Sequence, residues 1–299
     1  MDQVIKALAH DGRIRIIVAK TTDLVETARL IHDTHPTASA AFGRLLSMSA
    51  IMGSMLKNPD DQITCTIRGD GPLIKLMSIS DYQGNIKGFV AEPHVHLIND
   101  TSKKLDVAKA IGNGTMEIVK DMGLKTNFTS TIRMVSSEIG EDFAHYFTIS
   151  EQTPSAVSVG VLVNQDHSIA ASGAIVIQMM PGAQDEDIAI AEHVVAHLKP
   201  VSTIIAEGQK PKDIAMALFQ DVQILDEHSL QYECDCSRER TKSALKLVDI
   251  VDLKDMLLED GQAEIICHFC KKQYVFDQDD LTQIMKEKIE FDEHKRHSR

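Results

Sequence analysis

The sequence predicts an α+β protein in three parts. Residues 1–182 are expected to form an N-terminal domain in which a twisted antiparallel β-sheet carries helices, residues 183–229 a helical linker, and residues 230–299 a small C-terminal domain. Three observations predict this division. Strand patterns dominate up to Pro181-Gly182, short helical patterns without strands follow, and four of the five cysteines fall in the last quarter of the chain.

The composition is that of an ordinary soluble globular protein, because 43% of its 299 residues are hydrophobic and can bury a sizeable core. With 44 acidic and 31 basic residues, the formal net charge is -13, which opposes binding to phosphate backbones and argues against a nucleic-acid partner. Met1-Asp2-Gln3 has no basic flank followed by an apolar stretch, so we expect no secretory signal and a cytoplasmic location. Paired cysteines in that compartment are more often metal-binding or redox-active than structural disulfides.

The N-terminal domain is predicted to open with a strand and two helices. Alternation indicates a strand at Ile14–Ala19, and helical spacing follows over Leu24–Ile31. Pro36 then begins a longer helix, whose apolar residues recur mostly every three or four positions up to Lys57-Asn58-Pro59. Because Arg44 lies in its first half, we expect a core helix with packed methionines and no membrane span.

Strands make up most of the rest of this domain. Turn signatures at Gly69-Asp70-Gly71-Pro72 and Tyr82-Gln83-Gly84-Asn85 interrupt strand patterns and predict a meander. The first turn lacks the third glycine and the helix start of a dinucleotide fingerprint, so no phosphate cradle is predicted. Cys65 lies in an alternating strand and is expected to be a buried small hydrophobic residue. Further strands are predicted at Thr115–Asp121, Phe128–Val135, Val157–Val163 and Ala174–Met179, with a helix at Glu141–Ser150.

The linker is predicted to consist of short amphipathic helices with no strands of their own. Helical patterns cover residues 185–198, 202–206 and 213–219. Such helices have no independent core, so they must pack on another surface. His193 and His197 lie one helical turn apart, but the Glu of an H-E-x-x-H motif is absent, and we expect no ligand role for them.

The clustered cysteines predict a metal site, a redox site or both. Cys234 and Cys236 form a C-x-C pair, and a C-x-x-C pair, Cys267 and Cys270, follows thirty residues later. Four thiolates suit Zn²⁺, because two close pairs let the backbone close a tetrahedron and leave no position for a catalytic water. This predicts a structural site and no enzyme. An iron–sulfur cluster would use the same ligands and stays open, whereas Lys271 after Cys270 excludes a c-type haem.

The elements around the cysteines predict a small zinc-binding fold. Strands at Ala263–Ile266 and Gln273–Phe276 would place the C-x-x-C pair at the tip of a hairpin. Ser237 is expected to cap a helix running to about residue 247, a second helix covers Leu253–Leu258, and Asp277 caps a final helix. Four flanking cations are expected to offset the charge of the zinc–thiolate cluster and to favour thiolate: Arg238, Arg240, Lys271 and Lys272.

A unit of about seventy residues from Leu230 onward is near the size at which a hydrophobic core alone gives little stability. Zinc in such a unit is worth about 10–16 kcal/mol apparent. A permanently structural zinc knuckle is one reading. The other begins with oxidation of a thiolate to sulfenic acid, which condenses with the neighbouring cysteine to a disulfide that no longer holds metal. The linker helices would then lose their docking surface, which predicts a redox-gated protein that binds others through exposed apolar surface.

Motifs along essentially the whole chain match one family. The combined C-x-C and C-x-x-C at Cys234, Cys236, Cys267 and Cys270 is the most specific of them. The other segments are His35-Pro36-Thr37-Ala38-Ser39, Gly43-Arg44-Leu45-Leu46, Gly69-Asp70-Gly71-Pro72, Ser150-Glu151-Gln152, Pro154-Ser155-Ala156-Val157 and Gln178-Met179-Met180-Pro181-Gly182. In these residues the sequence resembles the redox-regulated 33-kDa heat-shock chaperones of the bacterial cytosol, and Phe42, where a smaller residue or leucine is expected, is a departure.

The resemblance implies an N-terminal α+β domain, a helical linker and a C-terminal zinc redox switch. It implies an ATP-independent holdase that binds unfolding or aggregation-prone proteins under oxidative stress. The four cysteines would bind zinc in the reduced, inactive form. Oxidation would join Cys234 to Cys236 and Cys267 to Cys270 as disulfides, release zinc, unfold the linker and produce a homodimer.

Two other classes of function stay open. A thiol–disulfide oxidoreductase would use Cys267 and Cys270 as an exposed couple, but its C-x-x-C begins a helix after a strand, and here strands are predicted on both sides. A zinc-ribbon adaptor for nucleic acid needs a basic face, which the net charge of -13 opposes.

Overall fold

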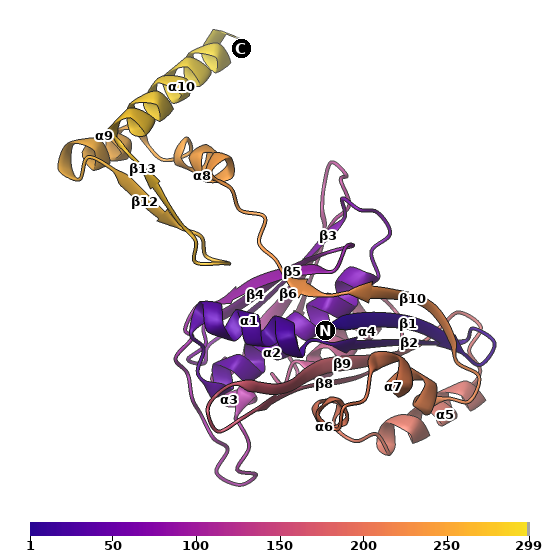
Figure 1. Ribbon diagram of the computed structural model, residues 1–299. Coiled ribbons are helices and arrows are strands. Elements are labelled where there is room, and N and C mark those ends of the chain that lie inside the picture. The colour runs from indigo at the N-terminus through magenta and orange to yellow at the C-terminus, as the bar shows by residue number, and fades with distance from the viewer. Residues whose placement is uncertain (298–299) are drawn as a thin grey trace. The chain divides into compact units, whose positions relative to one another are not determined.

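The structure is a computed structural model that describes residues 1–297, with side chains through Glu290. It divides into two compact units, Met1–Glu233 and Cys234–Arg299. The first unit contains two β-sheets (Figure 1). The five-stranded sheet has the order β10 (Gln223–Ser229), β1 (Gln3–Ala9), β2 (Ile14–Lys20), β9 (Ile169–Met179), β8 (Ser155–Val163). The six-stranded sheet has the order β11 (Gln231–Tyr232), β5 (Asn85–Val90), β4 (Lys75–Asp81), β3 (Gln62–Gly69), β6 (Gly114–Asp121), β7 (Phe128–Arg133).

The predicted α+β class is confirmed, with the strands shared between two sheets. All pairings within them are antiparallel except the short pairing of β11 with β5, and β3, β4 and β5 form the predicted meander. The long helix α2 (Pro36–Ser54) contacts strands of both sheets, and every residue in it except Arg44 is buried. The prediction of a core helix is therefore confirmed. The other helices of this region are α1 (Thr22–His32), α3 (Val107–Ile111) and α4 (Gly140–Ile149).

Three short helices cover the second face of the five-stranded sheet. They are α5 (Asp185–Ala196), α6 (Val201–Ala206) and α7 (Pro211–Leu218). Ala191, Ile205 and Ile214 from these helices form a hydrophobic cluster with side chains of the sheet such as Ile5 and Ile16. This confirms that the helices pack on another surface. That surface is the five-stranded sheet, so the expectation that the helices lose their docking surface with the zinc-binding unit is corrected. Because both faces of this sheet are covered, β2 and β9 are almost continuously apolar.

One detail of the linker prediction is wrong, because residues 183–229 do contain a strand. β10 pairs antiparallel with β1 at the edge of the five-stranded sheet. Its inward positions include the polar Asp226 and His228, and Asp226 forms an ion pair of 2.9 Å with Lys6 on β1. A strand is predicted when apolar residues occupy every second position. In β10 two of those positions are polar, and one of them forms this cross-strand ion pair. The separation of residues 183–229 from residues 1–182 as a distinct part stays a prediction.

The second unit is small. Its elements are α8 (Arg238–Leu245), α9 (Ile250–Glu259), β12 (Ala263–Ile266), β13 (Gln273–Phe276) and α10 (Gln278–His297). Both strands have their predicted bounds. Ser237 Oγ accepts a hydrogen bond from the Arg240 N–H at 3.2 Å, and Asp277 Oδ1 accepts one from the Asp280 N–H at 2.9 Å, so both predicted caps are confirmed.

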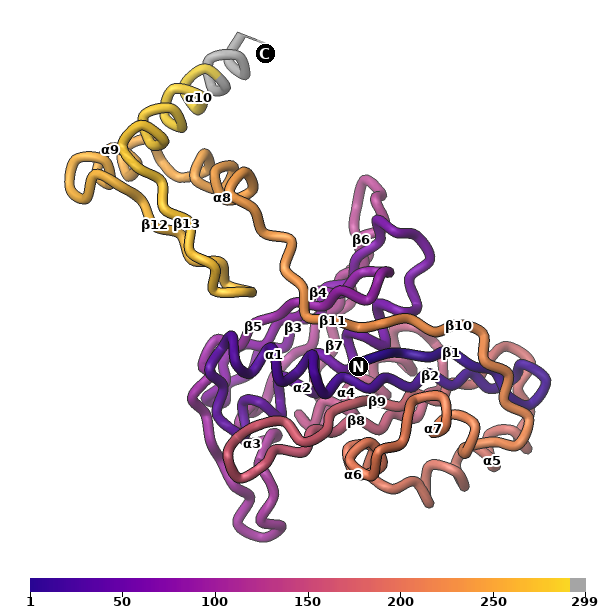
Figure 2. Tube along the Cα trace, viewed as in Figure 1, coloured from indigo at the N-terminus to yellow at the C-terminus, as the bar shows by residue number. Residues whose placement is uncertain are grey.

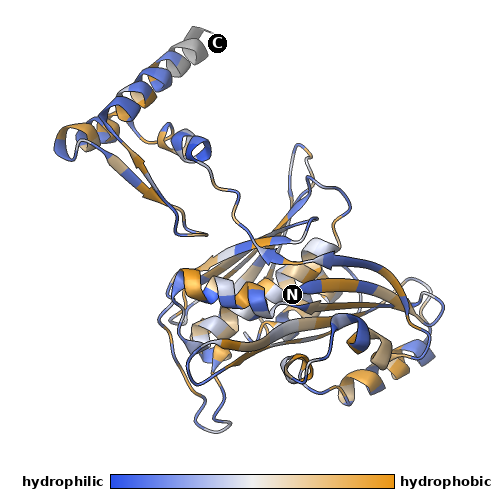
Figure 3. Cartoon of the chain, in the orientation of Figure 1, coloured by the Kyte–Doolittle hydropathy of each residue, from blue (hydrophilic) through white to orange (hydrophobic). Residues whose placement is uncertain are grey.

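Hydropathy differs between the elements of the two units. Figure 3 shows α8 as mostly hydrophilic, whereas hydrophobic residues recur along the strands of the first unit. None of the helices within residues 1–297 combines the length and the apolar character that a membrane span requires.

Candidate metal centre

The four predicted cysteines come together in the second unit. Their sulfur atoms all lie within 4.8 Å of one another, and no other set of three or more His, Cys, Asp or Glu side chains in the described chain is gathered in this way. The sulfurs of Cys234 and Cys267 are 3.7 Å apart, and those of Cys236 and Cys270 are 3.3 Å apart. Sulfurs at the corners of a tetrahedron with Zn–S bonds of about 2.3 Å are about 3.8 Å apart. The set of four soft donors therefore fits a zinc ion.

A tight turn positions the C-x-x-C pair. Cys267 follows β12, and its N–H donates to the carbonyl of Lys272 at 2.9 Å. The N–H of Lys271 donates back to the carbonyl of Cys267 at 2.9 Å, with Lys271 in the left-handed region at a φ of 59°. The C-x-C pair belongs to the segment that leads into the Ser237 cap of α8. Two separate local structures thus present their sulfurs to one point.

Tyr274 on β13 is part of the site, and the sequence analysis missed it. Its hydroxyl donates to the carbonyl oxygen of Cys236 at 3.1 Å and to the Cys236 sulfur at 3.2 Å. Tyr274 is buried together with Phe276, two residues farther along the same strand. That alternation was the available signal, because it puts a phenol on the covered face of a strand that follows a cysteine turn. The hydroxyl orients Cys236 and stabilises negative charge on its sulfur.

Protons are unevenly distributed over the metal-free cluster. Burial raises the pKa of Cys234 and of Cys270, and hydrogen bonds with neighbouring sulfurs add to that rise. Burial acts in the same direction on Cys236, but the hydrogen bonds from Tyr274 and from the Cys270 sulfur outweigh it and lower the pKa of Cys236 to about 7. Cys236 therefore loses its proton more readily than Cys234 or Cys270. A divalent cation must displace those protons, so its affinity falls as the pH falls.

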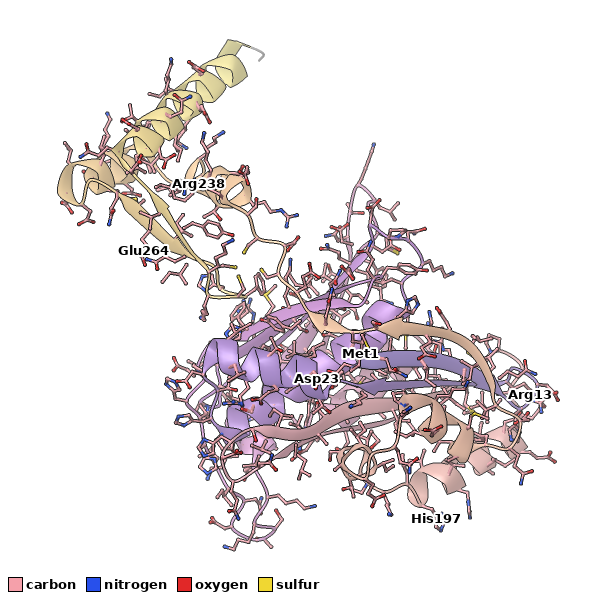
Figure 4. The ribbon with its side chains drawn as sticks, in the orientation of Figure 1. Met1, Arg13, Asp23, His197, Arg238 and Glu264 are labelled. Carbon is pink, nitrogen blue, oxygen red and sulfur yellow. The ribbon has the colours of Figure 1, made fainter. Side chains whose placement is uncertain are left out.

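Three of the four flanking cations have partners other than the sulfurs: Lys272 lies 5.3 Å from the centre of the Tyr274 ring, and two arginines are paired with carboxylates. Arg238 forms an ion pair with Asp280, donates to the Val275 carbonyl at 2.6 Å and lies 4.4 Å from the centre of the Phe276 ring. Figure 4 labels it at the start of α8. Arg240 forms an ion pair with Asp235. These two arginines are neutralised by carboxylates and offset the sulfur charge less than expected.

The fifth cysteine lies outside the site. Cys65 is fully buried in the large core of the first unit, as predicted for a small hydrophobic residue. Burial raises the pKa of its thiol to about 12. It is therefore protected both from solvent and from ionisation, and thiolate is the form that oxidants attack.

Comparison with known proteins gives a consistent result. The sequence profile of the family described as "Hsp33 protein" matches residues 2–277. The 33 kDa chaperonin of Bacillus subtilis is 42% identical over 283 residues, covering 94% of this chain and 97% of that protein, and that of Bacillus velezensis is 40% identical over 289 residues, covering 96% and 99%. The crystal structure of the 33 kDa chaperonin (heat shock protein 33 homolog) of Thermotoga maritima superposes with a TM-score of 0.89 at 32% identity, covering 96% of this chain and 99% of that one. The chain belongs to the Hsp33 family of chaperones.

Proposed function

We propose that the protein is a redox-regulated, ATP-independent holdase, which binds unfolding proteins under oxidative stress and is inactive while reduced and zinc-bound. The observation that carries the proposal is the gathering of four cysteine sulfurs within 4.8 Å in a unit with a small core. Among its described side chains, which extend to Glu290, seven are buried in that core: Leu245, Leu253, Ala263, Tyr274, Phe276, Leu281 and Ile284. So few apolar contacts leave the stability of the unit dependent on what joins the sulfurs.

In the resting state Cys234, Cys236, Cys267 and Cys270 hold Zn²⁺. The ion supplies cohesion by joining two chain segments, and it supplies no open coordination position for catalysis. We therefore expect no enzymatic turnover. Tyr274 holds the Cys236 sulfur in place through its 3.2 Å hydrogen bond.

Activation is the oxidation of these cysteines by a peroxide. A thiolate sulfur attacks one peroxide oxygen and becomes sulfenic acid, and the sulfur of the neighbouring cysteine then displaces water to form the disulfide. Each disulfide uses one hydrogen peroxide, takes two electrons and two protons from the pair, and yields two waters. Sulfurs paired as Cys234–Cys236 and as Cys267–Cys270 no longer donate to a metal, so zinc is released.

The pairing decides whether oxidation loosens the unit. The two sulfur–sulfur distances of 3.7 and 3.3 Å run between the segments, Cys234 to Cys267 and Cys236 to Cys270. A disulfide across residues separated by 33 positions would tie the segments together and stabilise the unit by roughly 3–4 kcal/mol. The pairing within each motif leaves the segments unconnected. The resemblance implies the pairs Cys234–Cys236 and Cys267–Cys270, and this pairing is the one consistent with activation by unfolding.

Loss of the second unit's fold is proposed to release residues 183–229 from the first unit. Within that segment α5 is loosely held, because only Asp187 and Ala191 are buried among its residues. A cavity of about 360 Å³ lined by Ile177 and Met179 of β9 lies beneath it. Detachment would expose the apolar face of the five-stranded sheet and the apolar sides of the helices. Such surface binds unfolded proteins and is also available to a second copy of the chain, which accounts for a homodimer.

The N-terminus of α5 is held by polar contacts. Asp187 accepts hydrogen bonds from Arg13 Nε at 2.8 Å and from the Gln184 N–H at 2.8 Å, and lies 3.2 Å from His10 Nδ1. Arg13 belongs to the turn between β1 and β2 (Figure 4). Release of the helix has to break these contacts.

The test is peroxide treatment of the zinc-loaded protein. We expect release of zinc, loss of four thiols, greater fluorescence of a hydrophobic dye and suppression of the aggregation of a thermally unfolding client, all without ATP. Cys65→Ser should respond as the wild type does, whereas Cys267→Ser should bind little zinc and lose the response to peroxide. Zinc release without any change in dye binding or client aggregation would reject the proposal. Turnover in a disulfide-reductase assay, or salt-dependent RNA binding despite the charge of -13, would favour the other classes instead.

Disulfide mapping by mass spectrometry tests the pairing separately. Cys234–Cys236 and Cys267–Cys270 are expected in the active, zinc-free protein. Predominant Cys234–Cys267 linkage in that protein would contradict the route by which oxidation loosens the unit. A bacterial cytosol is the expected compartment, because its reducing potential keeps the thiols available.

A further inference from the structure

The chain that precedes the first cysteine occupies an edge of both β-sheets. We call residues 223–232 the edge segment. Its first part, β10, pairs antiparallel with β1, and its last part, β11, pairs parallel with β5. In Figure 2 the orange trace of β10 and β11 runs along one side of the first unit beside β1. Without this segment, β1 and β5 would each become an edge strand with unpaired N–H and C=O groups.

The edge segment is held mostly by its backbone. The N–H groups of Leu230, Gln231 and Glu233 donate to the carbonyls of Asp2, Gly84 and Ile86 at 3.1, 3.0 and 3.0 Å. Hydrogen bonds of this kind do not depend on the identity of the side chains. A different extended polypeptide could therefore make the same bonds.

Some side chains of the edge segment also contact the first unit. Beside β1, Asp226 pairs with Lys6 and Ile224 packs against the apolar cluster of the five-stranded sheet. Leu230 is buried in the large hydrophobic core of the first unit. The Tyr232 hydroxyl donates to the Gly88 carbonyl at 2.7 Å, accepts from the Gly88 N–H at 3.3 Å and lies 3.1 Å from His32 Nε2. Beside β5 the site thus offers one apolar position and, two residues farther along the same face, one position for a polar tip.

We propose that the edges of β1 and β5 are a client-binding site, in which an extended segment of an unfolded protein takes the place of the edge segment by β-strand addition. The inference rests on the proposed function, because β10 lies within residues 183–229, whose release that function requires. It goes further by naming the surface and the binding mode. Strand addition suits a holdase, because backbone hydrogen bonds accept many sequences and select chains that are unfolded.

Gly84 shows how closely the edge segment approaches. It lies in the turn between β4 and β5 with a φ of 86°, and a Cβ atom added to it would be 2.2 Å from the carbonyl oxygen of Ser229. A Gly84→Ala substitution should therefore push the edge segment away. Gly123, in the turn between β6 and β7, is the matched control, because its φ of 67° imposes the same backbone strain and an added Cβ would meet no atom within 4 Å.

The variants are tested in the full-length protein. In the oxidised, zinc-free state, we expect Gly84→Ala to bind reduced, carboxymethylated α-lactalbumin, a permanently unfolded chain, about tenfold more weakly than Gly123→Ala or the wild type, because the added Cβ obstructs the backbone of any strand that takes the place of the edge segment. If Gly84→Ala does not fold, Tyr232→Phe decides in the reduced, zinc-loaded protein, where loss of the hydroxyl contacts loosens the edge segment and should strengthen client binding several-fold. Its control is Tyr82→Phe, since the Tyr82 ring packs against His228 at 5.8 Å and is kept. Equal binding by variants and controls would overturn the proposal.

Hydrogen exchange locates the client. Alternate amides of β1 and those of β5 that face the edge should be protected in the zinc-loaded protein, exchange about tenfold faster after oxidation, and become protected again when the unfolded α-lactalbumin binds. Suppressed aggregation with unchanged exchange in residues 1–9 and 84–90 would refute this inference and leave the proposed function intact. Absence of any suppressed aggregation would reject the proposed function, and this inference with it.

A peptide gives an independent readout. A labelled peptide of residues 222–233 should bind the oxidised protein about tenfold more tightly than the zinc-loaded protein, in which the site is filled by the chain itself. The same peptide with Leu230→Pro loses one N–H donor and should bind more weakly. Unfolded α-lactalbumin should displace the peptide. Binding that is equal in both redox states, or that the client does not affect, would count against strand addition.

Discussion

The two units of this protein achieve cohesion in different ways. In the first, α2 is buried along its whole length except at Arg44, and hydrophobic clusters lie on both faces of the five-stranded sheet. In the second, seven side chains form the buried core, while Leu247 and Leu258 are 85% and 82% exposed. The first unit owes its stability to many apolar contacts that no single reaction removes. We propose that the second depends on its four gathered sulfur atoms, which are only partly buried.

Removal of the metal should have the largest effect on this contrast. A chelator at neutral pH should abolish amide protection in the second unit and leave α2 protected, because structural zinc is worth about 10–16 kcal/mol to a small domain. Lower pH should promote the same loss, since zinc needs thiolates and the pKa of Cys236 lies at about 7. Hydrogen exchange followed by mass spectrometry measures both units in one sample. Persistent protection in the metal-free second unit would show that its seven-residue core suffices.

Loss of one buried aromatic ring should have a smaller effect than metal removal, and the effect should differ between the two units. Phe276 and Phe143 are both fully buried, one in each unit, and replacing either by Ala should cost about 3–5 kcal/mol. Phe276→Ala should lower zinc affinity about 100- to 1,000-fold, because folding and metal binding are coupled there. Phe143→Ala should lower the melting temperature of the first unit and leave zinc affinity unchanged. Competition with a chromophoric chelator measures the affinity, and equal values for both variants would contradict the coupling.

The smallest effect is expected at α5, which has only two buried residues, Asp187 and Ala191. The hydrogen bond from Arg13 holds the pKa of Asp187 below its ordinary value of 3.8. A carboxyl group with a lowered pKa stabilises the fold above its unfolded pKa, and this contribution disappears as the pH falls through the folded value. Asp187→Asn should therefore speed amide exchange in α5 several-fold at pH 7, and in the wild type exchange should rise relative to the rest of the unit below about pH 4. A variant with unchanged exchange in α5 would mean that the apolar contacts of Ala191 hold the helix.

Much of the fold follows from local patterns in the sequence. The hairpin strands β12 and β13 have the predicted bounds, because alternation and turn residues act over a few positions. The four cysteines converge as predicted, since paired thiolates have few other uses in a small unit. The predicted α+β class and the core position of α2 are also confirmed, because they too follow from hydrophobic periodicity within each segment.

What the sequence did not reveal depends on contacts between distant segments. β10 was missed because its inward Asp226 forms an ion pair with Lys6, more than two hundred residues away. β1 was missed because both of its faces are covered, so the adjacent residues Val4 and Ile5 are both buried and break the alternation. Tyr274 was missed as a contact of the site because its role depends on the position of Cys236 in space. Hydrophobic periodicity shows which face of a segment is buried, but it does not show which distant segment covers that face. These three features depend on such distant partners.

No residue separates the last hydrogen-bonded residue of the first unit from the first cysteine of the second unit. Glu233 donates its N–H to Ile86 at 3.0 Å, and the next residue, Cys234, is one of the four gathered ligands. A change in the backbone at Cys234 has to be accommodated by rotations in an adjacent residue that is already hydrogen-bonded. An insertion of a few glycines here would preserve both folds and all ligands but would give the chain slack. The length of this junction therefore determines how directly a backbone change at Cys234 reaches the hydrogen bond of Glu233.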